Sequence, residues 1–166
     1  MKTRQMLGCM IFVAGCFAFS HVTEASPFDQ GRVRVSFVAS SGGSFGNQYF
    51  IVGAGVGYFV LDGWEIGLDA EHWFGEDPTI SKLSTQTRYV VQALPPINPY
   101  LGVFHKHWFI GSDTDDIDTV GGRFGLFYVA SEHFFIGGGI VHEMIVSECE
   151  EDCSATYPEF TFSATF

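Results

Sequence analysis

Two histidines separated by one residue are the first candidates for chemistry. In His105-Lys106-His107 both imidazoles lie on one face if the segment is a strand, because strand side chains alternate between faces. Imidazole nitrogens bind zinc and other transition metals. Two ligands without a third do not complete such a site, so interfacial histidines near Trp108 are the favoured interpretation. We therefore expect no metal site and no cofactor.

Carboxylates gather in segments that we expect to be loops: Glu76 and Asp77; Asp113, Asp115, Asp116 and Asp118; Glu148, Glu150, Glu151 and Asp152. Oxygen clusters can hold calcium or magnesium. The second cluster lacks the glycine and the distal glutamate of an EF-hand loop, so a solvated acidic surface is expected. Two alternatives stay open: weak sharing of the divalent cations that bridge anionic surface lipids, and contact with an extracellular ligand.

The cysteine count bears on the redox compartment. Cys9 and Cys16 lie in the N-terminal leader, so only Cys149 and Cys153 remain in the rest of the chain. In an exported protein this pair predicts one disulfide across a short loop, with two free thiols as the alternative. A zinc site from this pair is not expected, because it supplies two of the roughly four ligands that zinc takes.

The segment nearest to a catalytic motif is His142-Glu143-Met144. It resembles the His-x-Ser pair that small-barrel lipid A deacylases carry near the end of the chain, but only in its histidine. Met144 stands where the serine nucleophile should be, and covalent catalysis needs an activated nucleophile. Ser147 would project from the opposite face of a regular strand. We expect no enzymatic activity.

The element that must position all of these residues is the last one, Tyr157 to Phe166. Its apolar and polar residues fall on opposite parities, the period-2 pattern of a strand with one apolar and one polar face. At a chain end this strand would be an exposed sheet edge unless it pairs with the first strand and closes a barrel.

Earlier segments alternate in the same way, which predicts an eight-stranded antiparallel barrel. The expected strands before the last one are residues 31–39, 50–60, 64–71, 83–93, 100–110, 120–130 and 134–144. Asp62-Gly63, residues 94–99 with their three prolines, and residues 131–133 are predicted as the short connections. Residues 40–48, 75–82, 111–119 and 147–155 are the expected longer loops. Aromatic residues near the strand ends fit a membrane-spanning barrel: Tyr58, Trp64, Tyr89, Trp108, Tyr128, Phe134 and Phe166.

Strand 100–110 has the least regular alternation of apolar and polar residues. We place Leu101, Val103 and Phe109 outside and Gly102 and Lys106 inside, with both histidines facing out. The opposite register or a bulge is the alternative.

The N-terminus carries an export signal. Lys2 and Arg4 precede an apolar run from Met6 to Phe19, and Ala25 is a small residue at the expected cleavage point. The run is shorter than the ~20 apolar residues of a spanning helix. Cys16 in Val-Ala-Gly-Cys offers an alternative, a lipoprotein signal. Cleavage after Ala25 would leave residues 26–166 as one domain and shift the formal net charge from −11 to −12, which disfavours a nucleic-acid partner.

The overall arrangement resembles the eight-stranded outer-membrane β-barrel domain family, the OmpA-like and OmpX-like small barrels. The hairpin from Gly55 to Leu68 and the closing strand ending on Phe166 carry the resemblance. It implies insertion into the outer membrane of a Gram-negative bacterium as a monomer, in contact with lipid and lipopolysaccharide. It also implies that the final aromatic is part of the signal read by the barrel assembly machinery. No peptidoglycan-binding domain follows the barrel, which disfavours wall anchoring.

The inward parity collects most of the charge. It carries the basic residues Arg32, Arg34, Arg88, Lys106 and Arg123 and the acids Glu65, Asp69, Glu71, Glu143 and Glu159. An eight-stranded barrel is just wide enough for side chains to fill it, and confined charges persist when paired. We expect an interior closed by ion pairs. The predicted role is structural, in the envelope, or adhesive, through the loops; a lipid A-modifying enzyme and a narrow solute channel are the alternatives.

Overall fold

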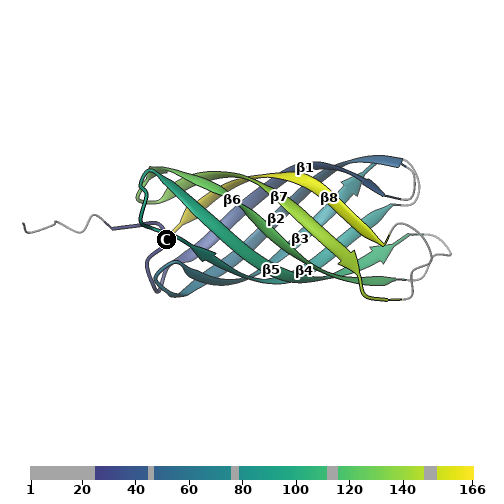
Figure 1. The fold of residues 1–166 in the computed structure, drawn as a ribbon, viewed down its shortest axis with the longest axis horizontal. Helices are drawn as coiled ribbons and strands as arrows, with labels where there is room; N and C mark the ends of the chain where they lie inside the picture. The colour runs from purple at the N-terminus through teal and green to yellow at the C-terminus, as the bar shows by residue number, and fades with distance from the viewer. Residues whose placement is uncertain (1–24, 45–46, 76–78, 112–115, 148–152) are drawn as a thin grey trace, which may run out of the picture.

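The protein is an eight-stranded closed barrel. A computed structural model describes residues 25–44, 47–75, 79–111, 116–147 and 153–166. All neighbouring strands pair antiparallel, and the first pairs with the last (Figure 1). The strands are β1 (Val33–Ser44), β2 (Asn47–Leu61), β3 (Trp64–Phe74), β4 (Ile80–Val90), β5 (Ile97–Ile110), β6 (Ile117–Ser131), β7 (Phe134–Ile145) and β8 (Ser154–Thr165). Within the described ranges, no helix is long and apolar enough to cross a membrane.

Closure joins β1 to β8 along residues Arg34 to Ser40 and Glu159 to Thr165. Phe166 extends this pairing by one residue, because it exchanges both backbone hydrogen bonds with Val33 at N···O distances of 3.1 and 3.0 Å. The predicted barrel fold is confirmed, and the terminal aromatic lies at its seam.

The barrel has two different ends. The turn end holds the short connections β2–β3, β4–β5 and β6–β7 together with Val33 and Phe166. Gly63 there has a φ of +73°, a conformation that glycine adopts easily, as the Asp-Gly signal predicted. The loop end lies opposite, where β1 finishes and β2 begins (Figure 1).

The two-residue alternation sends apolar side chains outward. Phe37, Leu101, Val103, Phe124 and Phe160 are between 57% and 65% exposed, which in a membrane means contact with lipid. Outward aromatics collect near the turn end: Tyr58, Trp64, Tyr89, Tyr128, Phe134 and Phe166. Such rings favour the membrane–water interface.

Several strands are longer than the sequence pattern predicted. β1 continues to Ser44 and β2 starts at Asn47, so most of 40–48 is strand instead of loop. The segment is rich in glycine and serine, which are common in loops, but small residues also fit a crowded interior. A Cβ on Gly42 would touch the ring of Tyr157 at 3.5 Å. β4 likewise begins at Ile80 and β8 at Ser154.

Pro95 and Pro96 lie in the β4–β5 connection, as predicted, but Pro99 does not. β5 begins at Ile97 and includes Pro99, which the sequence assigned to the connection. Pro99 cannot donate a backbone hydrogen bond, but its carbonyl still accepts one from Val91 at 2.8 Å. The third residue of a strand tolerates this loss better than its centre.

The register of β5 matches the predicted one, with one consequence that the sequence analysis missed. Leu101, Val103 and Phe109 face outward and Lys106 is fully buried. Trp108 has the parity of Lys106 and is 2% exposed, so it lies inside the barrel. Its expected place among interfacial aromatics is therefore wrong.

Candidate functional site: the charged interior

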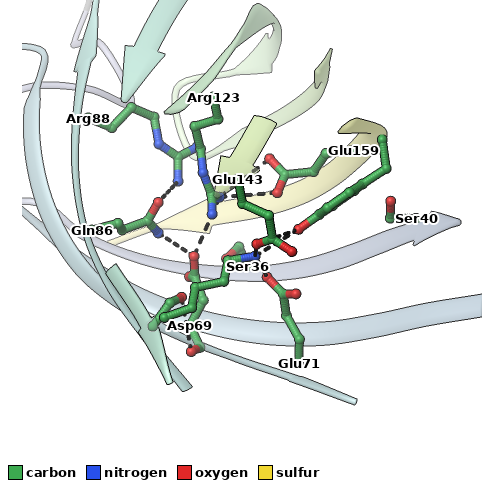
Figure 2. Close-up of polar contacts among 12 residues, drawn as sticks. Ser36, Ser40, Asp69, Glu71, Gln86, Arg88, Arg123, Glu143 and Glu159 are labelled. Atoms are coloured by element: carbon green, nitrogen blue, oxygen red, sulfur yellow. Dashed lines mark hydrogen bonds and ion pairs between the residues drawn. The ribbon is translucent and has the colours of Figure 1, made fainter. Parts of the chain in front are cut away.

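The turn-side half of the interior contains an arginine network. It consists of Arg34, Glu65, Asp69, Arg88, Arg123 and Glu159, with Gln86 between them. Arg34 Nε lies 2.5 Å from Glu65 Oε1, and Arg123 Nη1 lies 3.1 Å from Glu159 Oε2. Figure 2 shows Gln86 bridging Arg88 to Asp69, and Arg123 reaching both Asp69 and Glu159. Residues from five strands, β1, β3, β4, β6 and β8, are thus connected across the lumen.

The loop-side half contains a lysine network. It consists of Glu71, Lys82, Lys106 and Glu143, with the hydroxyl of Tyr157. Lys106 Nζ lies 2.8 Å from Glu71 Oε1 and 2.9 Å from the Tyr157 hydroxyl, and Lys82 Nζ lies 2.8 Å from Glu143 Oε1. Lys106 also approaches the second oxygen of Glu143 at 3.6 Å, so the two lysines share that carboxylate.

Each network is electrically neutral by itself. Three guanidinium groups face three carboxylates in one, and two ammonium groups face two carboxylates in the other. All ten side chains are at most 6% exposed. Buried charges are tolerated when they are paired, so each half satisfies that condition without the other.

The locations of two basic residues differ from those that the sequence predicted. Arg32 is not in either network: it precedes β1, and its Nη1 lies 3.1 Å from His133 Nδ1 in an exposed contact at the turn end. Lys82 was assigned to a loop but is a buried member of the lysine network. Extending the inward parity of Gln86 and Arg88 back along β4 would have found it.

Glycines of β2 make room for the acids of β3. A Cβ on Gly57 would overlap the Glu65 carboxylate, and one on Gly55 would overlap that of Asp69. These two inward glycines therefore face the ion pairs directly. A side chain at either position would displace a carboxylate from its arginine.

Replacing Gly57 with alanine is expected to lower the free energy of unfolding by about 1–3 kcal/mol, the usual cost of overpacking. Guanidinium chloride titration of the barrel refolded in lipid vesicles measures this. Gly122→Ala is the matched control, because a Cβ there meets only the Gly102 carbonyl oxygen at 3.7 Å. Equal stability of both variants would show that Glu65 does not need the space.

Aromatic clusters close the lumen on both sides of the ion pairs. The turn-end cluster consists of Phe28, Phe59, Val90, Tyr100, Phe127 and Phe135. The loop-end cluster consists of Tyr49, Ile51, Trp73, Ile80, Phe104, Trp108, Ile110, Val141 and Tyr157. Sequence analysis predicted the ionic filling but neither cluster, because both depend on inward residues of many strands meeting at one height.

Lys82 connects the loop-end cluster to the lysine network. Its Nζ lies 3.6 Å from the centroid of the Trp73 ring and 3.0 Å from that of the Trp108 ring. An ammonium group over an aromatic face is stabilised by the ring quadrupole, and more strongly where water is excluded. The two tryptophans therefore help to solvate a buried cation as well as fill the barrel.

His105 and His107 lie on the outer surface, as the predicted register requires. Asp118 on β6 is within reach of both: its Oδ1 lies 3.4 Å from His105 Nε2 and 3.0 Å from His107 Nδ1. His107 Nε2 also lies 3.6 Å from Asp116. Within the residues that the structure describes, no group of three or more His, Cys, Asp or Glu could hold a metal ion.

The segment compared with a catalytic pair is split by the barrel wall. His142 is exposed on the outside and its Nδ1 lies 2.7 Å from Thr156 Oγ1, whereas Glu143 points inward to the lysine network. Met144 is 49% exposed on the outer face.

Of the two cysteines in the predicted disulfide, only Cys153 belongs to the described residues. Cys153 is disulfide-bonded. Cys149, its expected partner, lies outside the described residues, as do Cys16, the leader up to residue 24, and most of the acidic loop residues.

Comparison with solved structures places the fold. The N-terminal β-barrel domain of OprF from Pseudomonas aeruginosa superposes with a TM-score of 0.66 at 18% identity, covering 82% of this chain and 98% of that one. Neisserial surface protein A (NspA) gives a TM-score of 0.61 at 14% identity, covering 81% and 94%. A de novo designed transmembrane β-barrel gives 0.52 at 14%, covering 83% and 98%. No protein-family model and no curated protein matches the sequence.

The fold and the surface together define the class. The chain is an eight-stranded β-barrel with the architecture of outer-membrane proteins, an apolar exterior and an ion-paired interior. The lumen of this chain is divided into two neutral networks between two aromatic clusters.

Proposed function

We propose that this protein is a non-enzymatic, non-conducting barrel of the bacterial outer membrane, with a structural role in the envelope or a contact role through its loops. The observation that carries the proposal is the filled interior. Two neutral ion-pair networks and two aromatic clusters occupy the lumen from one end to the other.

The surface supports the same role. Outward side chains of the strands are apolar and match a lipid environment, with aromatics near the turn end. The turn end would face the periplasm and the loop end the cell exterior. The acidic residues near the loop end would then be presented outside the cell, where they could meet an extracellular ligand or divalent cations.

Conductance of the purified protein in planar lipid bilayers tests the closed interior. We expect no stepwise current, because solute would have to displace both aromatic clusters and break charge pairs that exclude water. A water-filled porin in the same bilayer is the positive control. Reproducible unitary steps from the folded barrel would replace this proposal with the channel alternative.

Mass spectrometry of lipid A from cells with and without the protein tests the alternative that the protein is a lipid A-modifying enzyme. Acylation is expected to be unchanged, because Met144 stands where the serine of the deacylase pair should be and His142 Nδ1 contacts Thr156 Oγ1. A mass difference of one acyl chain would contradict the non-enzymatic part.

A further inference from the structure

The segment before β1 enters the barrel. Pro27 and Phe28 are buried although no regular element contains them, and Phe28 is 0% exposed. The Phe28 ring contacts three inward rings of the turn-end cluster, with centroid distances of 4.8 Å to Phe135, 5.8 Å to Phe127 and 5.9 Å to Phe59. The ring therefore fills the turn-end mouth of the lumen.

Hydrogen bonds attach this segment to the neighbouring turn. The Phe28 carbonyl accepts from Gly63 N at 2.8 Å, and Gln30 N donates to Asp62 Oδ1 at 2.9 Å. Gln30 Nε2 donates to the Val60 carbonyl at 3.0 Å, and Gly31 N donates to the Phe59 carbonyl at 2.8 Å. The end of β2 and the β2–β3 turn thus bind the segment through hydrogen bonds to Phe28, Gln30 and Gly31.

Ser26 and Asp29 fold the segment into the shape that presents the ring. Ser26 N lies 2.8 Å from Asp29 Oδ2, Asp29 N donates to the Ser26 carbonyl at 3.2 Å, and Phe28 N donates to Ser26 Oγ at 3.3 Å. Among the described residues of this segment, Ala25 is exposed, Ser26 is half-buried, and Pro27 and Phe28 are buried, so burial begins after the Ala25–Ser26 bond. That bond is also the expected processing point.

We propose that the turn-end mouth is a binding site for the chain's own processed N-terminus, an α-ammonium group followed two residues later by an aromatic ring. Residues 26–31 form this N-terminal plug. Hydrolysis of the Ala25–Ser26 bond by a signal-processing protease consumes one water, leaving a carboxylate on Ala25 and an ammonium on Ser26. The Ser26–Asp29 hydrogen bond then becomes a charged pair, which is stronger than the neutral one.

The plug can be tested by the access of water-soluble reagent to the turn-side lumen. Ser163 is 1% exposed, and its register partner on β7 is Phe135, which contacts the Phe28 ring. A Ser163→Cys variant is treated in detergent with a charged methanethiosulfonate, which does not modify disulfide-bonded cysteines. With Phe28 present, the new thiol is expected to react slowly. Adding Phe28→Ala is expected to speed the reaction about tenfold or more. Without the ring, the reagent reaches the thiol and no longer has to wait for local opening of the N-terminal segment.

Three comparisons make the result specific. Phe124→Ala removes an outward ring that is 59% exposed and should leave the labelling rate unchanged. A Ser84→Cys variant, buried among the ion-paired strands at 2% exposure, should stay protected with or without Phe28. Asp29→Asn keeps a hydrogen-bond acceptor but loses the charge, so it should increase Ser163→Cys labelling less than Phe28→Ala does. Heat-modifiable gel migration verifies that each variant is folded.

The outcomes separate the plug from the closed interior on which it rests. Labelling that Phe28→Ala does not change, in a barrel that also does not conduct, overturns the plug alone. Stepwise current through the unmodified protein overturns the closed interior instead. Mass spectrometry of the protein purified from membranes should find Ser26 as the first residue; any other start overturns the ammonium part of the proposal.

Discussion

Lys106→Met is expected to lower the free energy of unfolding by about 3–5 kcal/mol, because it leaves a carboxylate buried without its cation. Among the described residues, Lys106 supplies the ion pair of Glu71, which is 6% exposed. Methionine has a similar length, so the change removes charge more than volume. The midpoint of guanidinium chloride unfolding in lipid vesicles, at unchanged slope, measures the loss.

A second substitution tests whether charge is the cause. Lys106→Met combined with Glu71→Gln makes the lysine network neutral again, because Lys82 and Glu143 remain paired at 2.8 Å. The double variant is expected to recover part of the stability that the single variant loses. If single and double variants unfold at the same denaturant concentration, the loss comes from packing and the ion-pair explanation is wrong.

Trp108→Ala is expected to cost about 3–5 kcal/mol, the range for truncating a buried aromatic side chain. The ring packs on Trp73 with centroids 5.4 Å apart, donates from Nε1 to Thr119 Oγ1 at 3.1 Å, and covers the Lys82 ammonium. Alanine would leave a cavity and remove one of the two rings that stabilise the buried cation. The same unfolding titration measures the effect.

The neighbouring residue is the matched control for this variant. Phe109 is adjacent in sequence but faces outward at 47% exposure, where lipid fills the space that alanine leaves. Phe109→Ala should therefore destabilise the barrel clearly less than Trp108→Ala. If Trp108 instead lay in the interfacial girdle, as the sequence pattern suggested, the two variants would differ little.

The fold was accessible from the sequence because strand geometry is local. Side chains alternate with a period of two whatever the strand pairs with, so Arg34, Arg88 and Lys106 could be assigned to the inward face without any contact being known. The same reasoning placed Phe166 at a closing seam, since an apolar terminal strand needs a partner on each edge. Two errors arose where composition was given more weight than parity, whereas Arg32 has the inward parity but precedes β1 and lies outside the networks. Lys82 and Trp108 both have the inward parity and were assigned elsewhere because of nearby acids or an expected girdle.

Other features had no local signal. Division into an arginine and a lysine network depends on which residues of different strands meet at one height, and barrel closure and strand stagger set that height. Phe28 lies in a segment without alternation, and only the assembled mouth of the barrel gives its ring a place to bind.

By itself, the sequence determined the barrel, its apolar exterior and the faces on which most of its charges lie, because those properties follow from alternation along each strand. The tertiary structure alone decided which charges pair, that each half of the lumen is neutral, and that aromatic rings close both ends. These depend on distances between residues far apart in the chain, such as Arg123 and Glu159 at 3.1 Å, which only the closed sheet brings together.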